Sequence, residues 1–388
     1  MMKVLIVNTS ERTGGAAVAA NRLKDALNNN GIEANMLVRD KLSDDTTVFT
    51  IKNGWRTQWN KLWERWCIFW HLHFSKRNLF AIDIANAGTD ITQLQAFKDA
   101  DVVHLAWINQ GMLSLKGIEK ILKTGKPLVW TMHDIWPATA VCHITLDCRQ
   151  FETQCKDCRL LPSGIGRNLA RRTWKRKEAI ERRSHIIYIT CSKWLQGEAK
   201  RSALIGQNLI ECIPNPIDTS IFCKADKAEA RRKLGLPADK RLILFASQRV
   251  TNQNKGMGYL VDACRKMVEQ HPETLANTAV VVLGGHAEDL RENFDLPMFP
   301  LGYVSDTQRI VDVYNAIDVF VLPSLSDNLP NTIMEAMACG VPCVGFEVGG
   351  IPEMIDHEHN GYVVKMKDSA DLAYGINWVL NVADYGKL

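Results

Sequence analysis

The 388-residue sequence has no long apolar run, no large excess of charge and no leader-like N-terminus. A helix that spans a bilayer needs about 20 consecutive apolar residues, and no run approaches that length. The formal net charge is only +4, so the protein as a whole is not expected to have a strongly positive electrostatic field that attracts nucleic acid. Because the chain enters a predicted strand at residues 3–8 without a signal peptide, we expect a cytoplasmic protein that binds no nucleic acid.

Length and composition indicate a globular protein with more than one core. A hydrophobic content of 46% and a charged content of 23% are typical of soluble proteins. A chain of 388 residues suits two domains of roughly 190 residues each. Several of the eleven cysteines, Cys264, Cys339 and Cys343 among them, lie in apolar runs and are expected to be small buried side chains. A disulfide framework is not expected in a chain of this size without an export signal.

The stretch 318–344 carries the strongest structural pattern. An apolar run at 319–324 predicts a buried strand, and a polar loop follows it. Asn331 is a suitable helix cap, the helix then runs through Met337, and Gly340 ends it before the next apolar strand. Strand, loop, helix and strand in this order form a βαβ unit of a parallel sheet, so the fold class is α/β. The loop therefore lies at the carboxyl edge of the sheet, where open α/β folds bind ligands.

Two carboxylates flank that edge, Asp327 in the loop and Glu335 one turn into the helix. Backbone N–H groups at Asn331 and Thr332 lie at the positive end of the helix dipole, which suits a phosphate. A carboxylate is electrostatically unfavourable beside a phosphate, so the two acids are better suited to hydroxyl groups. The pattern favours a nucleotide sugar, with phosphates in its middle and polyols at both ends. An ordinary βαβ unit with a capped helix is the alternative.

These residues resemble the donor-site signature of retaining glycosyltransferases of family 4. That signature has two acids separated by seven residues, then Ala-Met-Ala-x-Gly-x-Pro-x-Val and Gly-Gly-x-x-Glu. Here Asp327 and Glu335 precede AMACGVPCV at 336–344 and GGIPE at 349–353. The first acid is Asp, where the family more commonly has Glu. The resemblance implies a GT-B fold, in which two Rossmann-like domains with parallel sheets face each other across a cleft.

The resemblance also implies a division of the chain. Residues 1–212 would form the acceptor domain and residues 213–388 the donor domain, with 213–218 (IPNPID) as a rigid linker. Family members commonly carry a further C-terminal helix that crosses back to the first domain. The chain ends soon after a predicted helix at about residue 370, so the donor domain is expected to be truncated at its C-terminus.

Roles for individual residues follow from the same resemblance. Glu335 would bind the ribose and Asp327 the transferred sugar. His133, in the context Met-His-Asp at the end of a predicted strand, would act in the site from the first domain. Gly14 and Gly15, in the loop after the first strand, would lie against the donor phosphate and the acceptor. Backbone groups at Gly302 and Tyr303 would hold the nucleotide base.

Arg249 and Lys255 follow the first predicted strand of the second domain and stand at its carboxyl edge. Two cations at this place suit a diphosphate leaving group, whose developing charge must be neutralised. Cationic side chains can replace the metal that other transferases use, so no catalytic metal is expected. The family has a similar basic pair. The alternative is two solvated surface cations.

Residues 55–74 hold five of the eleven tryptophans, at positions 55, 59, 63, 66 and 70. These steps put all five on one stripe of a helix. Tryptophan favours the membrane interface, so the helix is a candidate for peripheral attachment to the inner face of a membrane. The alternative is that the stripe packs on the first domain as core. The basic segment 167–183 is either a solvated helix face or a patch for anionic lipid or a pyrophosphate-linked acceptor.

Cys142, Cys148, Cys155 and Cys158 fall within the loop 142–158. The last two form a Cys-x2-Cys knuckle, and four thiolates would satisfy a structural zinc. The first two gaps are irregular, so free thiols and disulfides stay open as alternatives.

The sequence as a whole predicts a retaining glycosyltransferase that moves a sugar from a nucleoside diphosphate sugar to a glycan or lipid-linked acceptor in cell-surface polysaccharide synthesis. Two alternatives remain: a nucleotide-sugar epimerase-like enzyme on the same fold, and a non-catalytic partner that only binds a nucleotide sugar.

Overall fold

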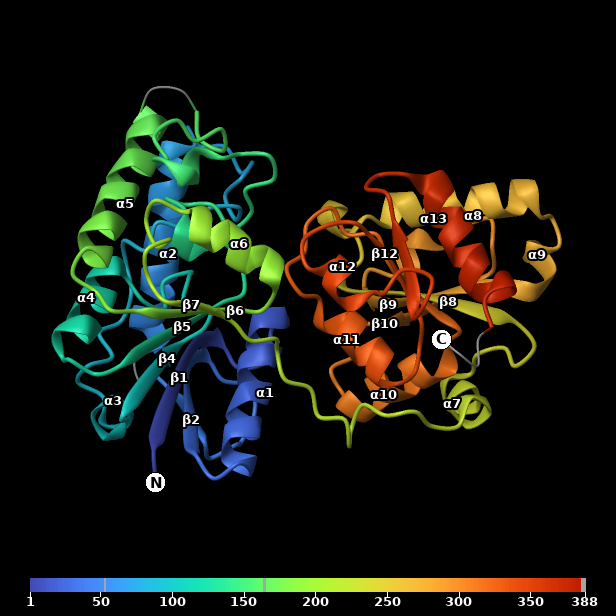
Figure 1. Ribbon diagram of the computed structural model, residues 1–388, viewed down its shortest axis with the longest axis horizontal. Helices are drawn as coiled ribbons and strands as arrows, with labels where there is room; N and C mark the ends of the chain where they lie inside the picture. The colour runs from blue at the N-terminus through green and yellow to red at the C-terminus, as the bar shows by residue number, and fades with distance from the viewer. Residues whose placement is uncertain (52–53, 163–164, 385–388) are drawn as a thin grey trace. The chain divides into compact units, whose positions relative to one another are not determined.

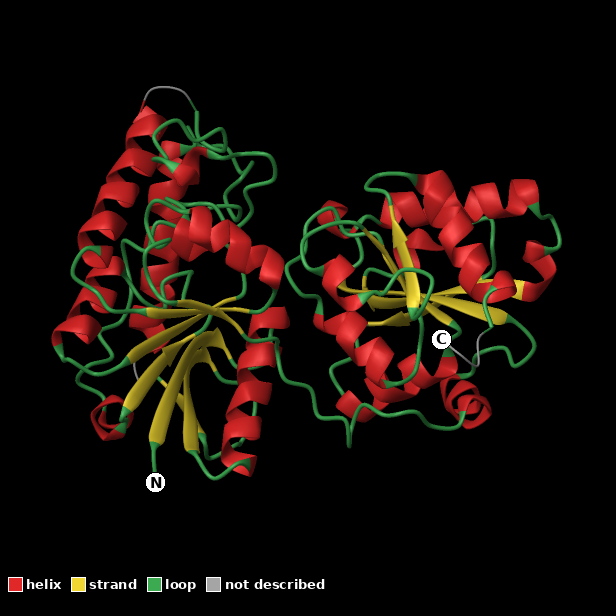
Figure 2. Ribbon diagram, viewed as in Figure 1, coloured by secondary structure: helices red, strands yellow, loops and turns green. Residues whose placement is uncertain are grey.

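The computed structural model describes residues 1–51, 54–162 and 165–384. The chain divides into two compact units, Met1–Pro216 and Ile217–Leu388. Each unit contains its own parallel sheet with helices packed on it (Figures 1 and 2). The point of division falls four residues after the predicted boundary, inside the proline-containing segment 213–218.

Over the described residues, the N-terminal unit has a seven-stranded sheet in the order β3-β2-β1-β4-β5-β6-β7, and every neighbouring pair is parallel. The order reverses between β1 and β4, where open parallel sheets form a ligand crevice at their carboxyl ends. The strands are β1 (Lys3–Ser10), β2 (Glu33–Asp40), β3 (Val48–Thr50), β4 (Val102–Leu105), β5 (Leu128–Met132), β6 (Ile187–Thr190) and β7 (Ile210–Cys212).

Helices of the N-terminal unit cover both faces of this sheet (Figure 2). The side chains of β1 alternate: Val4 and Ile6 pack with α1, whereas Leu5 and Val7 join a larger cluster that includes residues of α2 to α6. A strand buried on both faces is typical of a parallel sheet. The helices are α1 (Gly15–Asn29), α2 (Gly54–His71), α3 (Gln95–Asp99), α4 (Leu115–Lys123), α5 (Ile165–Glu181) and α6 (Lys193–Arg201), with short turns η1 (Trp136–Ala138) and η2 (Gln150–Glu152).

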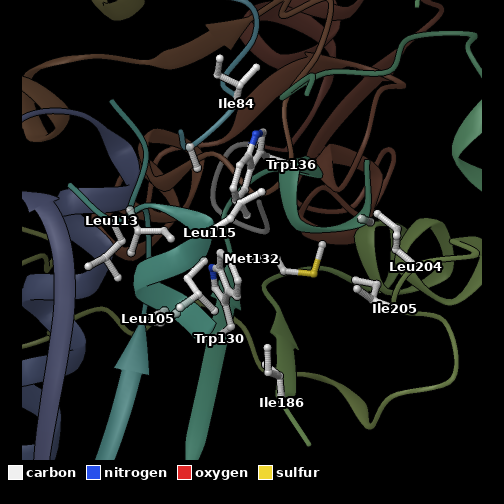
Figure 3. Close-up of a cluster of buried hydrophobic side chains, with 14 of the residues drawn as sticks. Ile84, Leu105, Leu113, Leu115, Trp130, Met132, Trp136, Ile186, Leu204 and Ile205 are labelled. Atoms are coloured by element: carbon white, nitrogen blue, oxygen red, sulfur yellow. The ribbon is translucent and has the colours of Figure 1, made fainter. Parts of the chain in front are cut away.

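Aromatic packing fixes the end of β5. Trp130, on this strand, lies with its ring centroid 6.1 Å from that of Trp136 and stacks at 6.0 Å on Tyr188 of β6. Figure 3 shows Trp130, Trp136 and Met132 within the larger cluster of buried side chains. Because Met132 is the last residue of β5, this packing also determines where the next residue, His133, is held.

The C-terminal unit has a six-stranded sheet over its described residues, in the order β10-β9-β8-β11-β12-β13, again with parallel neighbours. Its order reverses between β8 and β11. The strands are β8 (Arg241–Arg249), β9 (Thr278–Gly285), β10 (Met298–Gly302), β11 (Val319–Leu322), β12 (Cys343–Phe346) and β13 (Gly361–Val364).

The side chains of β8 alternate in the same way. Ile243 and Phe245 pack with α8 and α13, whereas Leu242 and Leu244 pack with α7, α10 and α11. Cys264, Cys339 and Cys343 are buried, as their apolar context predicts. The helices are α7 (Lys227–Leu234), α8 (Met257–Gln270), α9 (Thr274–Asn277), α10 (Thr307–Ala316), α11 (Asn331–Ala338), α12 (Ile351–Met354) and α13 (Ser369–Asn377), with short turns η3 (Gln253–Lys255), η4 (Glu288–Asn293) and the π-helical turn η5 (Trp378–Val382).

The βαβ unit predicted at 318–344 is confirmed as β11, α11 and β12, with one correction at the helix start. Asn331 is the first helical residue, and the cap position belongs to Pro330, which makes no side-chain cap hydrogen bond. Proline favours the extended conformation that it has here, so the chain enters the helix without a polar cap. Gly340 follows the helix with φ of 74°, as expected of a residue that ends it.

The tryptophan stripe of α2 does not pack as core, so that interpretation is wrong. Its buried residues are Thr57, Glu64, Arg65 and Ile68, and all five tryptophans are exposed. Glu64 accepts hydrogen bonds from the backbone N–H groups of Ile84 (3.0 Å) and Ala85 (2.6 Å), so the inward face of the helix is held by polar contacts. The periodic stripe is therefore the outer face.

Candidate functional site

In the C-terminal unit, the loops after β8 and β11 meet at the point where the strand order reverses. Leu325 N–H donates to the carbonyl of Asn254 at 2.8 Å, which joins the two loops. Gly256 has φ of 75°, and a Cβ at this position would lie 1.8 Å from the carbonyl oxygen of Pro323. Only glycine allows the two loops to come this close, so their contact requires the glycine at residue 256.

This approach brings together two residues that were predicted to bind different parts of a ligand. Lys255 Nζ donates to Asp327 Oδ2 at 2.6 Å. Both side chains are partly exposed, at 28% and 17%, so solvent and solutes reach the pair. A diphosphate and a sugar hydroxyl can each replace one partner of such a pair. Arg249 is the last residue of β8 and is exposed at the same edge.

The helix α11 starts from the same loop. Asn331 and Thr332 are its first two residues, and the residue before them offers no side-chain cap. The N–H groups of a first helical turn carry the positive end of the dipole, which favours an anion. Gly350 N–H donates to the carbonyl of Asn328 at 2.8 Å, which attaches the Gly-Gly segment of the signature to this loop.

Glu335 lies one turn into α11 and is buried. Its Oε2 accepts a hydrogen bond from the hydroxyl of Tyr314, a buried residue of α10, at 2.9 Å. Burial and the neighbouring Glu335 raise the pKa of Tyr314 well above its usual value, so the hydroxyl stays a donor. Sequence analysis missed Tyr314, because the two residues are 21 positions apart and no local pattern links them.

Gly302 and Tyr303 lie at the carboxyl end of β10, on the same edge of the sheet. Gly302 has φ of 66°, and Tyr303 is exposed. The strand turns here through a conformation that glycine adopts without strain. The structure thus places Arg249, Lys255, Gly302, Tyr303, Asp327, Asn331, Thr332 and Glu335 along one edge of the C-terminal sheet.

In the N-terminal unit, the loop with Gly14 and Gly15 follows β1 at the corresponding reversal of strand order. Gly14 precedes α1 with φ of 93°, and a Cβ there would meet nothing within 4 Å. The requirement for glycine is therefore conformational. Thr9 N–H, near the end of β1, donates to the carbonyl of Trp107 at 2.8 Å, so the strand that leads into this loop is tied to the segment after β4.

His133 follows β5 and lines a cavity of about 220 Å³ within the N-terminal unit. Most of the lining is apolar and comes from α1, the sheet and the segment 213–216, with His104 as the second imidazole. Burial lowers the pKa of His133 to about 4, although the neighbouring Asp134 acts in the opposite direction. His133 is therefore neutral near pH 7 and offers one donor and one acceptor nitrogen.

A charge network surrounds Asp134, the residue that follows His133. Sequence analysis did not find this network. His143 contacts Asp134 Oδ2 through Nδ1 at 2.8 Å and Asp83 Oδ2 through Nε2 at 2.6 Å. Burial opposes the imidazolium, but Asp134 and Asp83 raise the pKa of His143 to about 10. Asp83 also pairs with Arg65 of α2. Trp107 Nε1 donates to Asp134 at 3.0 Å, so the network holds the residue next to His133 from several sides.

The four cysteines of the loop 142–158 are free thiols, and the other three lie close enough to Cys142 to contribute to its raised pKa. Burial raises the pKa of Cys142 to about 12 and that of Cys155 to about 11, so both are protonated thiols near neutral pH. Within residues 1–51, 54–162 and 165–384, no group of three or more Cys, His, Asp or Glu side chains has the arrangement of a metal site. Structural zinc stays a prediction.

Two family models match the chain, one in each unit. The model described as Glycosyltransferase Family 4 matches residues 13–221, and the model described as Glycosyl transferases group 1 matches residues 240–382. The first match alone spans more than half of the chain.

Curated relatives match over a shorter part of their length. An uncharacterized glycosyltransferase of Methanocaldococcus jannaschii is 33% identical over 205 residues, which are 51% of each chain. A D-inositol 3-phosphate glycosyltransferase of Acidothermus cellulolyticus is 30% identical over 190 residues, 44% of this chain and 40% of that protein. The match thus spans about half or less of these relatives.

Solved structures match the fold over the whole chain. The Anabaena protein HepE, in complex with UDP and glucose, has a TM-score of 0.63 at 18% identity, covering 100% of this chain and 91% of that one. The glycosyltransferase WaaG has a TM-score of 0.62 at 12% identity, covering 98% and 90%. At these identities the likeness establishes the fold, so the predicted arrangement of two Rossmann-like α/β domains of the GT-B type is confirmed.

Proposed function

The chain belongs to the glycosyltransferases of family 4, and from that premise we propose that it transfers a sugar from a nucleoside diphosphate sugar to an acceptor hydroxyl with retention of configuration. The observation that carries the proposal is the Lys255–Asp327 pair, a cation and a carboxylate at the reversal point of the C-terminal sheet. The carboxylate of Glu335 lies on the helix that starts from the same loop. A ligand with a diphosphate between two polyols matches this combination of charges.

The diphosphate is assigned to the cations and to the start of α11. Lys255 is within reach of solutes, and Arg249 is exposed at the end of the neighbouring strand. Together with N–H groups at Asn331 and Thr332, these cations would bind the negative charge of the phosphates. When the ligand binds, Lys255 exchanges Asp327 for a phosphate oxygen, which frees the carboxylate.

The polyols are assigned to the carboxylates. Asp327, once released from Lys255, accepts hydrogen bonds from the transferred sugar. Glu335 accepts hydrogen bonds from the ribose, and Tyr314, whose hydroxyl donates to Glu335 Oε2, is the positioning residue for it. Backbone groups at Gly302 and Tyr303 are assigned to the base. The presence of UDP in the HepE complexes makes uridine the first nucleotide to test.

The N-terminal unit is assigned to the acceptor. Gly14 and Gly15 would let a ligand approach the backbone at the start of α1. His133, neutral near pH 7, would donate a hydrogen bond to a sugar hydroxyl without adding charge. The curated relatives that act on D-inositol 3-phosphate are consistent with a polar, hydroxyl-bearing acceptor.

The reaction breaks the bond between the anomeric carbon and the diphosphate oxygen, and the diphosphate leaves with the electron pair. The acceptor hydroxyl attacks the same face of the sugar, and its proton passes to the departing phosphate oxygen. Lys255 and Arg249 neutralise the charge that develops on the leaving group, which is the largest contribution assigned to the protein. No pair of carboxylates in glycosidase geometry is needed for this route.

For the biological role, we propose a glycan or lipid-linked acceptor in cell-surface polysaccharide synthesis, on the cytoplasmic face of a membrane. Among the described residues, no helix is long and apolar enough to cross a bilayer. The attachment that we propose is peripheral.

The proposal is tested by the variant Glu335→Gln, assayed for transfer from a radiolabelled UDP-sugar to a lipid extract or glycan mixture. We expect transfer to fall sharply while the unfolding temperature stays close to that of the wild type, since the amide keeps the size of the carboxylate. Glu269→Gln, which makes the same change at an exposed glutamate of α8, is the matched control. Unchanged transfer by Glu335→Gln would overturn the assignment of the donor site.

A further inference from the structure

An aromatic surface covers the outer face of α2. Its five tryptophans, Trp55, Trp59, Trp63, Trp66 and Trp70, are between 45% and 72% exposed, and Leu62 of the same helix and Phe74 are exposed as well. Phe74 joins two of these rings, because its centroid lies 5.2 Å from that of Trp70 and 6.4 Å from that of Trp66. Soluble monomers seldom expose contiguous apolar surface of this kind unless it binds something.

The orientation of α2 is fixed by its inward face. Glu64 accepts hydrogen bonds from two backbone N–H groups, and Arg65 donates to the carbonyls of Leu79 (2.6 Å) and Ile82 (3.2 Å) and pairs with Asp83. The helix also packs closely on the unit, because a Cβ at Gly111 would lie 2.5 Å from the backbone nitrogen of Lys61. Turning the tryptophans inward would leave buried charges and N–H groups without these partners, at a large cost in free energy.

Segment 54–80 exposes positive charge and no negative charge. Segment 54–80 contains a single acidic residue, Glu64, which is fully buried. Its exposed cations are Arg56, Lys76 and Arg77. The helix α5 contacts α2 and lies beside it in Figure 1. This helix adds four exposed cations and two partly buried acids: Arg171, Arg172, Lys175 and Arg176, with Glu178 and Glu181.

We propose that the aromatic surface of α2 docks on an anionic lipid bilayer. Tryptophan rings partition into the interface between headgroups and acyl chains, where the ring is apolar and the N–H stays hydrated. The surrounding cations match the negative surface potential of a bilayer with anionic lipids. A second copy of the chain fits less well, because pairing this face with itself would bring cations together with no exposed acid in the segment to neutralise them. The proposal does not rest on glycosyl transfer.

The test is co-sedimentation of the full chain with vesicles of phosphatidylcholine, with and without phosphatidylglycerol. We expect binding to the anionic vesicles that weakens with salt and is much weaker on the neutral ones. The double variant Trp63→Gln with Trp66→Gln is expected to lower the partition coefficient by about tenfold or more, since two interfacial rings are removed. Lys76→Glu with Arg77→Glu is expected to lower it on anionic vesicles only.

The matched control is Leu42→Gln with Leu209→Gln, which removes two side chains of the same unit that are 63% and 56% exposed outside the aromatic surface. It should bind vesicles like the wild type. Nucleotide-induced thermal stabilisation should be equal in all variants, so loss of membrane binding and loss of the proposed function are distinguishable. Three outcomes would overturn the proposal: no binding of the folded chain to anionic vesicles, unchanged binding by the tryptophan variant, or tryptophan-dependent self-association without lipid binding.

Discussion

Lys255 and Asp327 are 72 residues apart in the chain, yet Lys255 Nζ lies 2.6 Å from Asp327 Oδ2 at the reversal point of the C-terminal sheet. The pair keeps a cation and a carboxylate in place without fixing either to the core, since both remain partly exposed. A ligand that carries phosphate and hydroxyl groups can divide the pair and satisfy both members.

Lys255→Met should lower kcat by about 100- to 1,000-fold, because a positioned cation at a leaving group contributes that much to the rate. Stabilisation by the nucleoside diphosphate should fall with it. Steady-state kinetics and thermal shifts measure the two effects. Lys365→Met, which removes an exposed lysine of the same unit, is the control and should behave as wild type. Equal losses in both variants would contradict the assignment.

The variant Asp327→Asn distinguishes binding of the donor sugar from binding of the diphosphate. Because the amide no longer neutralises Lys255, diphosphate binding should be kept or strengthened, while discrimination between donor sugars should be lost. Isothermal titration with UDP and with several UDP-sugars measures the difference. If UDP affinity falls and sugar discrimination is unchanged, Asp327 does not bind the sugar.

Tyr314→Phe removes the hydroxyl that holds Glu335. The free energy of unfolding should fall by about 1–3 kcal/mol, as expected when a buried acceptor loses a hydrogen bond. The KM for the donor should rise more than kcat falls, because Tyr314 acts on binding through Glu335. Denaturant titration and kinetics test both points, with Tyr374→Phe, an exposed tyrosine, as control. A loss of stability with no change in KM would make the contact purely structural.

Gly256→Ala should separate the two loops of the site. Its φ of 75° strains alanine, and the added Cβ would lie 1.8 Å from the carbonyl oxygen of Pro323. Gly235 provides a matched control, since it has φ of 66° but nothing within 4 Å of an added Cβ. Gly256→Ala should therefore cost about 2 kcal/mol or more beyond Gly235→Ala and weaken nucleotide binding. Equal costs would show that the loops do not depend on this approach.

Because of His143, the free energy of unfolding of the N-terminal unit should decrease as the pH becomes alkaline. Its pKa is raised in the folded chain to about 10 from an ordinary 6.5, so the imidazolium is favoured by folding. The contribution is complete below pH 6.5 and is lost as the pH rises through about 10. His143→Gln should be less stable than wild type near neutral pH, with the difference narrowing toward pH 10. A difference independent of pH would mean that His143 is neutral.

The sequence predicts the βαβ unit at 318–344 well, because strand, loop and helix signals there are local and agree with one another. It predicts a cap at Asn331, whereas Pro330 takes that position, since a proline before a polar residue satisfies the same pattern. The stripe of α2 is equally clear in the sequence. The sequence does not show whether the stripe faces the core or the solvent, because that depends on contacts of Glu64 and Arg65 with residues 79–85.

The sequence predicts residues of the candidate site but not the contacts between them. Asp327, Glu335 and Lys255 can be found from strand ends and from the family signature. The Lys255–Asp327 pair, the Tyr314 hydroxyl and the His143 network join residues 9 to 72 positions apart. No periodicity or spacing predicts these contacts, because they depend on how the strands are ordered in the sheet.

The most direct test of the central claim is a thermal-shift comparison of wild type and Lys255→Met with UDP, GDP, ADP and their sugars. A ligand that binds only the native state raises its apparent stability. The account predicts that one nucleotide family stabilises the wild type and that the shift is largely lost in Lys255→Met. A folded wild-type chain that no nucleotide stabilises, or a shift unchanged by Lys255→Met, would contradict it.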